Sequence, residues 1–182
     1  LSEMGYCKTQ ALEDYRSQHR GGKGKSITQI KEEDVIHSFH IGKAHDTLLV
    51  FTTRGRVYWL KMYRCPRASR ISRGRPINNL LPLHDDESVT AILPIREFDA
   101  TRTLLMATRS GKVKKVTLAS FARPRSTGLI AIDLLEDDAL DYVSVMSGDD
   151  EVILLSSLGK AVRFHETDVR VMGRQARGVR GI

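Results

Sequence analysis

The sequence predicts an all-β fold, a propeller-like array of four-stranded blades. The first observation is a unit that recurs around Gly5, Gly55, Gly111 and Gly159, at intervals of 50, 56 and 48 residues. The second is that no stretch combines an apolar period of 3.6 residues with helix caps over three turns, so helix should be scarce. About four short strands in each unit of this length are typical of a propeller-like blade.

The composition is that of a folded, basic chain. Of its 182 residues 41% are apolar, which is enough for a core. Lys and Arg number 29 against 22 acidic residues, which gives a charge of +7 and a pI near 9.6 and suits a polyanionic partner or an acidic membrane surface. No apolar run approaches the roughly 20 residues that span a membrane. Cys7 and Cys65 form no metal-binding motif, so a reduced, cytoplasmic chain is expected.

Each unit begins with a predicted β-hairpin. The first strands are apolar runs at 48–51, 104–107 and 152–155, and the second strands, rich in Val or aromatic residues, lie at 57–60, 113–116 and 162–164. A short polar turn that contains a glycine joins each pair, as hairpins require. The glycine supplies the positive φ of the tight turn.

The remaining elements follow the hairpin in a fixed order. A basic loop ends at Gly24, Gly74, Gly128 or Gly178, which lie 19, 19, 17 and 19 residues after the hairpin glycine. Segments of β type are predicted next, at 26–30, 77–81 and 129–135. Acidic turns follow at 32–34, 85–87 and 136–138. Closing strands are then predicted at 35–41, 89–95 and 142–146.

The predicted domain organisation is a single domain over 1–182. Its approximate blades are 1–44, 45–98, 99–147 and 148–182. The first unit holds little of its leading strand, and the last unit stops before its acidic turn. We therefore expect a fragment of a longer parent chain, whose neighbouring blades supply the missing strands.

The basic loops are the candidate binding site. If the blades repeat by rotation, equivalent loops lie along one rim, where the planar fork of Arg suits phosphate and glycine lets backbone N–H groups approach it. No recognition helix is predicted, so we expect contacts to the backbone of double-stranded DNA without sequence specificity.

An isolated arginine would be an ordinary solvated charge, but the repetition of basic loops in four units favours a binding site. The candidates are Gln18, His19, Arg20, Gly21, Gly22, Lys23, Gly24, Lys25, Arg67, Arg70, Arg73, Arg75, Arg123, Arg125, Arg174, Arg177 and Arg180; Lys112, Lys114 and Lys115 add charge to the third unit.

Other chemistry finds little support in the sequence. The acidic groups 85–87 and 149–151 lie between strand signals and are interpreted as turns, not metal ligands. The run 21–24 lacks the spacing of a nucleotide-binding loop. Trp59 is expected to pack rather than to stack on bases. No nucleophile–base pair is evident, so no catalytic residue, metal or cofactor is predicted.

The box Gln18-His19-Arg20-Gly21-Gly22-Lys23-Gly24 resembles the seven-residue box of the C-terminal domain family of the DNA gyrase A protein. Six of seven positions agree, and His19 stands where that family usually has Arg. The resemblance continues through 52–58, 73–77, 107–115, 172–173 and 178–181, so it extends over essentially the whole chain.

The resemblance implies a six-bladed β-pinwheel with strands exchanged between neighbouring blades. Duplex DNA would wrap around its basic outer rim, and the box would be needed for wrapping. The parent would be an ATP-dependent bacterial type II topoisomerase that introduces negative supercoils and is cytoplasmic and chromosome-associated. Its catalytic tyrosine, ATP and Mg²⁺ would lie on other domains or other chains of the enzyme, and its partners would be the N-terminal domain of gyrase A and the gyrase B protein.

Two alternatives stay open. The first is the matching domain of the topoisomerase IV A protein, which generally lacks an intact box. The second is a propeller-like scaffold that binds proteins. It predicts that the Arg-rich loops are dispensable and that affinity depends little on salt.

Overall fold

The computed structural model describes residues 1–15, 20–22 and 34–182. Within these ranges no α-helix occurs, as the sequence predicts, and no helix is long and apolar enough to cross a membrane. The helical turns of the described chain are all 3-10: η1 (Leu12–Asp14), η2 (Met62–Arg64), η3 (Ile77–Asn79), η4 (Leu118–Phe121) and η5 (Glu166–Asp168).

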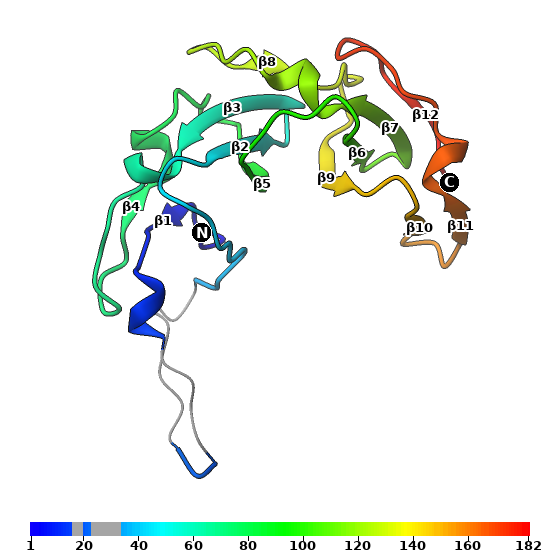
Figure 1. Ribbon diagram of the computed structural model, residues 1–182. Helices are drawn as coiled ribbons and strands as arrows, with labels where there is room; N and C mark the ends of the chain where they lie inside the picture. Colours follow the sequence, from blue (N-terminus) through cyan, green and yellow to red (C-terminus); the bar gives the residue numbers. More distant parts are fainter. Residues whose placement is uncertain (16–19, 23–33) are drawn as a thin grey trace.

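The strands are short and antiparallel, and the sheets that they form follow one another along an arc (Figure 1). The two four-stranded sheets have the orders β5-β2-β3-β8 and β12-β7-β6-β9, and the two-stranded sheets are β1-β4 and β10-β11. The strands are β1 (Tyr6–Cys7), β2 (Thr47–Thr52), β3 (Arg56–Lys61), β4 (Arg75–Pro76), β5 (Val89–Ile95), β6 (Thr103–Thr108), β7 (Lys112–Thr117), β8 (Leu129–Ile130), β9 (Leu140–Met146), β10 (Glu151–Leu155), β11 (Ala161–His165) and β12 (Val179–Arg180).

The predicted hairpins are confirmed in three units, as β2–β3, β6–β7 and β10–β11. Their central pairs include Leu49 with Trp59 and Leu105 with Lys115. The predicted closing strands are also confirmed in the second and third units, where β5 pairs with β2 and β9 pairs with β6.

In each four-stranded sheet, the edge strand that pairs with the second strand of the hairpin comes from the following unit. β8 pairs with β3 of the second unit, and β12 pairs with β7 of the third. In the same way β4 pairs with β1. This is the strand exchange that the family resemblance implies. β4, β8 and β12 lie on the convex side of the arc, whereas β5 and β9 lie on its concave side (Figure 1).

Three predicted strands are wrong or too long. Residues 129–135 pair only at Leu129–Ile130, and 77–81 begins with η3 rather than a strand. The cause is the same in both: the chain leaves the strand to donate backbone N–H groups to the preceding hairpin glycine, from Ala131 to Gly55 and from Ile77 to Gly5, each at 2.8 Å.

Residues 35–41 form no strand. They hold one bridge, between Ile36 and Ser2, and the N–H of His37 donates to the Leu1 carbonyl. Their backbone hydrogen bonds in the described chain go to residues 1–3, which are too few to build a longer ladder. The predicted segments 26–30 and 32–33 lie outside the described residues.

The core lies between successive sheets, because the inner strands are buried on both faces. Along β2, Leu48 and Val50 join one apolar cluster while Leu49 and Phe51 join the next. Counted along the arc, these are the first and second clusters. β6 repeats the pattern, because Leu104 and Met106 join the second cluster while Leu105 and Ala107 join a third. This explains why the strands read as continuous apolar runs without alternation. Each blade therefore depends on its neighbours for its core.

Candidate nucleic-acid interface

Three basic loops precede the exchanged strands: loop 65–74 before β4, loop 122–128 before β8 and loop 170–178 before β12. All three lie along the convex side of the arc (Figure 1). Each ends in a glycine with positive φ, at Gly74 (87°), Gly128 (73°) and Gly178 (87°). The spacing that the sequence shows therefore corresponds to equivalent places in the fold.

These glycines allow the loops to approach the hairpin of the preceding unit. A Cβ added at Gly128 would lie 2.7 Å from the Tyr58 ring, and one added at Gly178 would lie 2.5 Å from the Val113 carbonyl oxygen. Both positions also need a backbone conformation that residues with a side chain rarely adopt. The loop glycine thus fixes where each basic loop leaves the preceding hairpin.

Three loop-anchoring residues, Lys8, Arg56 and Lys114, bind the basic loops through hydrogen bonds to their backbone. Each lies on or directly after the strand that follows the turn glycine of its unit, and each donates hydrogen bonds to backbone carbonyls of the next unit's loop. Lys8 Nζ donates to the carbonyls of residues 69, 70 and 72 at 3.1, 3.0 and 2.8 Å. Arg56 Nη2 donates to Thr127 at 2.7 Å, and Lys114 Nζ donates to Arg174. Cationic donors on these carbonyls order the loop backbone.

The predicted loop arginines point to solvent. Within the described residues, Arg177 is the one member of the predicted set with an ion pair, to Asp133 at 2.8 Å. Arg174 is half-buried, and the others on loops or exchanged strands are exposed: Arg67, Arg70, Arg73, Arg75, Arg123, Arg125, Arg177 and Arg180. The convex side therefore carries positive charge that the described part of the protein leaves largely unneutralised.

Arginines at the hairpin turns differ from those in the loops. Arg54 pairs with Asp86 at 3.1 Å, and Arg109 lies 4.0 Å from Asp141. The acidic residues come from the turn before the closing strand or from that strand itself, so charge is balanced at this end of the blades. Positive charge is thus concentrated on the loops that precede the exchanged strands.

The glycine-rich box is described only in part. Arg20, Gly21 and Gly22 are exposed, and Gly21 has a φ of 85°. Gln18, His19, Lys23, Gly24 and Lys25 lie outside the described residues.

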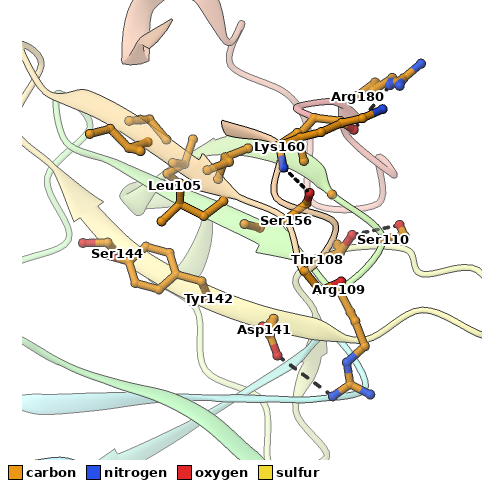
Figure 2. A pocket seen from close by; sticks show the side chains of 18 of the residues that line it. Leu105, Thr108, Arg109, Ser110, Asp141, Tyr142, Ser144, Ser156, Lys160 and Arg180 are labelled. Carbon is orange, nitrogen blue, oxygen red and sulfur yellow. Dashed lines mark hydrogen bonds and ion pairs between the residues drawn. The ribbon is translucent and has the colours of Figure 1, made fainter. Parts of the chain in front are cut away.

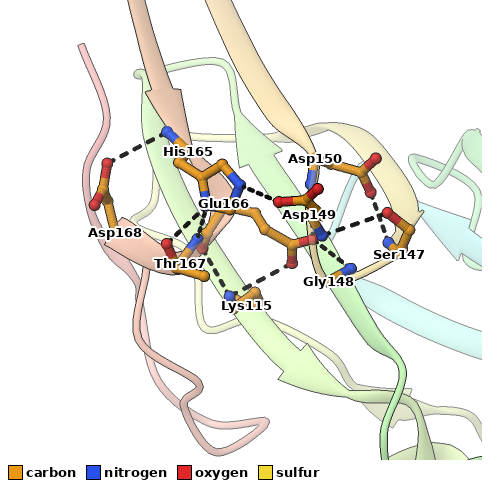
Figure 3. A network of polar contacts seen from close by, with 9 residues as sticks. All are labelled: Lys115, Ser147, Gly148, Asp149, Asp150, His165, Glu166, Thr167 and Asp168. Atoms are coloured by element: carbon orange, nitrogen blue, oxygen red, sulfur yellow. Dashed lines mark hydrogen bonds and ion pairs between the residues drawn. The ribbon is translucent and has the colours of Figure 1, made fainter.

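Two lysines assigned to the basic surface are in fact buried, which corrects the prediction. Lys114 is fully buried, and burial lowers its pKa to about 8. Lys115 lies 3.5 Å from the Glu166 carboxylate and donates to the Glu166 carbonyl at 2.7 Å (Figure 3). Glu166 also accepts from the N–H groups of Gly148 and Asp150, at 2.6 and 3.2 Å. Both lysines hold the fold together instead of facing a ligand.

Asp85 and Asp86 lie in a turn, as interpreted from the sequence, whereas Glu151 of the second acidic group is the first residue of β10. Glu87 is buried and accepts from Tyr58 Oη at 2.9 Å and from the N–H of His84 at 3.1 Å, and it also bonds Thr52. Burial, together with the bond to Glu87, raises the pKa of Tyr58. Trp59 packs against the second core cluster and donates from Nε1 to the Phe121 carbonyl at 2.8 Å, which confirms its packing role.

The sequence does not reveal the anchoring role of Lys8 and Arg56. A weak signal exists, because Lys8 and Lys114 both stand three residues after a hairpin glycine. Their partners are backbone carbonyls up to 64 residues away, which no sequence pattern reveals.

A cavity of about 970 Å³ opens between the sheet β12-β7-β6-β9 and β10 (Figure 2). The Arg109–Asp141 pair lies at one wall, and Lys160 and Arg180 lie at another. In the described chain its lining residues form no pair of nucleophile and base. It lies between successive blades, and Arg180 of the exchanged strand β12 is the member of the candidate set that lines it.

Comparison with known proteins gives a consistent result. Residues 1–42, 46–96, 102–145 and 150–182 match the family described as DNA gyrase C-terminal domain, beta-propeller. Over 182 residues the chain is 56% identical to the DNA gyrase A protein of Salmonella typhimurium and 52% identical to that of Escherichia coli. Each match covers 100% of this chain and 21% of the relative, so the chain spans about a fifth of the length of these curated relatives.

Solved structures share the fold. The chain superposes on the C-terminal domain of DNA topoisomerase IV with a TM-score of 0.84 and 28% identity, over 99% of this chain and 55% of that one. For the DNA gyrase A C-terminal domain the TM-score is 0.73 at 28% identity, over 100% and 58%. The E. coli ParC C-terminal domain gives a TM-score of 0.76 at 20% identity, over 99% and 68%, which supports the fold alone.

Proposed function

Because the chain belongs to the DNA gyrase C-terminal domain family, we propose that it binds duplex DNA along the convex side of its arc and wraps the duplex around it. The observation that carries the proposal is the equivalent placement of three anchored, arginine-rich loops, largely without ion pairs, on this side. Phosphates every few ångströms along a duplex can meet such a row of charges, and a curved row favours a bent duplex.

The proposed contacts are the arginines of the three loops and exchanged strands, together with the box 18–25. Ordered loop backbones would keep the guanidinium groups in place, so less entropy is lost on binding. In this proposal affinity comes from phosphate contacts and carries little sequence information.

We propose further that the fragment 1–182 acts as one non-catalytic domain within a larger type II topoisomerase. The activity of the parent, its use of ATP, its contacts with an N-terminal gyrase A domain and the gyrase B protein, and its cytoplasmic, chromosome-associated location belong to the same proposal. Support comes from the gyrase A relatives, of which this chain matches about a fifth. The topoisomerase IV alternative is not favoured, because gyrase A proteins match the whole of this chain at 56% identity.

The proposal is tested by the salt dependence of binding to a linear duplex of random sequence. The double variant Arg123→Gln/Arg125→Gln should bind more weakly and lower the slope of log K against log salt by about 1 to 2, because each lost phosphate contact removes about 0.9. The matched control is Arg54→Gln/Arg109→Gln, which removes arginines already paired with carboxylates and should leave the slope nearly unchanged.

Equal slopes for the wild type and the loop variant would contradict binding through these loops. Tight binding to a protein partner with almost no salt dependence would instead support the scaffold alternative.

A further inference from the structure

The two cysteines of the chain lie together in its interior, away from the basic loops. Cys7 belongs to β1, and Cys65 directly follows η2. Both are free thiols, 7% and 8% exposed, and both belong to the apolar cluster between the first and second sheets. No role in the proposed DNA interface accounts for the pairing of two thiols from different units.

Backbone register brings the two cysteines opposite one another. Thr9 and Arg67 form a parallel bridge, in which the Thr9 N–H donates to the Pro66 carbonyl at 2.9 Å. Two residues earlier on each segment stand Cys7 and Cys65, on the same face as the bridge pair. Neighbouring strands lie about 4.8 Å apart, within the range of about 4.4–6.8 Å between Cα atoms that a disulfide needs.

The thiols also interact directly. The hydrogen bond from Cys65 lowers the pKa of Cys7, whereas the same bond, together with burial, raises the pKa of Cys65. The lowered pKa favours the thiolate form of Cys7, and a thiolate is the nucleophile in disulfide chemistry.

A small oxidant has a route to the pair. A cavity of about 610 Å³ is lined by both cysteines and, among the described residues, by the basic side chains Lys8, Arg67 and Arg73. These three cations outnumber the two carboxylates of the lining, Glu13 and Asp34, and this excess of positive charge favours an anionic disulfide such as oxidised glutathione.

We propose that Cys7 and Cys65 are a redox pair that forms a reversible intrachain disulfide with a small disulfide oxidant. The Cys7 thiolate attacks one sulfur of oxidised glutathione, which forms a mixed disulfide and releases one glutathione thiolate. The Cys65 sulfur then attacks the Cys7 sulfur and releases the second. Two electrons pass to glutathione, and the two cysteine protons end on its two thiols.

The bond would tie the first unit to the second. Cys65 begins loop 65–74, and Cys7 lies eleven residues before the box in sequence. Oxidation would therefore link the segment that leads to the box with the neighbouring basic loop. The inference does not rest on DNA binding.

The test incubates the reduced chain under native conditions in a buffer of oxidised and reduced glutathione until the populations are constant. The expected product is a monomer lighter by two hydrogen atoms, in which a tryptic map joins the Cys7 and Cys65 peptides and no thiol reacts with N-ethylmaleimide. Its thermal midpoint should rise by about 5 °C or more, because the link constrains the unfolded chain. Dithiothreitol should reverse every change.

Cys7→Ser and Cys65→Val are the controls, since each leaves one thiol and neither can lose two hydrogen atoms. The proposal is overturned if the folded wild type keeps both thiols at equilibrium while the chain in urea oxidises. Two separate glutathione adducts, or disulfide-linked dimers, would overturn it equally.

Discussion

Burial divides the basic side chains of this chain into two groups with different tasks. Arg123 and Arg125 are exposed on a loop, whereas Lys114, on a strand of the same unit, is fully buried. A buried ammonium group costs free energy unless its donors are matched, and Lys114 meets the carbonyls of Ala131 and Arg174. The buried Lys114 therefore positions a loop, and the exposed arginines supply the charge.

The perturbed pKa of Lys114 predicts a pH dependence of stability. Between its folded value of about 8 and its ordinary value of 10.5, the unfolded chain binds a proton that the folded chain has lost. Stability from this group therefore rises with pH across that window. Lys114→Met removes the group, so urea titrations should show the wild type gaining free energy of unfolding relative to the variant as the pH rises. A constant or falling difference would show that the lysine is not perturbed.

At the scale of elements, the exchanged strands depend on their neighbours. β4, β8 and β12 are each two residues long, and such strands have no stability of their own. Each is held by the hairpin of the preceding unit and by the glycine before it. The loops, the strands and the junctions between units therefore form one structural feature.

Gly178→Ala should destabilise the fold by about 2 kcal/mol or more. The alanine would be strained in the left-handed backbone conformation, and its Cβ would clash with the Val113 carbonyl oxygen. Gly173→Ala, in the same loop, is the matched control. It meets nothing within 4 Å and does not have a positive φ, so its free energy of unfolding should change by less than about 1 kcal/mol. Denaturant unfolding measures both, and equal losses would reject the assigned role of the loop glycine.

The inner strands can be predicted from the sequence because their signal is local. The predicted strand 89–95 coincides with β5, and the hairpins follow from apolar runs about a turn glycine. The short exchanged strands could not be found from alternation, since two residues carry no period. Lys114 is wrongly predicted to be exposed because lysine usually is, and its two carbonyl partners lie 17 and 60 residues away in sequence.

At the scale of the whole molecule, the apolar clusters between sheets and the exchanged strands join the units into an arc. Because the junctions repeat, equivalent loops recur at equivalent places on the convex side. The basic charge becomes a curved row through the repeat itself and does not depend on any single loop. We propose that this curved row of charge bends duplex DNA along the convex side.

Religation of a nicked circular DNA in the presence of the domain tests that claim most directly. The family resemblance implies a wrap with a positive crossing, which should shift the topoisomers to positive linking differences, and the shift should grow with the ratio of protein to DNA. The Arg123→Gln/Arg125→Gln variant should give a smaller shift at equal occupancy. Saturated binding with no change in linking number would contradict the account, because the domain would then bind DNA without wrapping it.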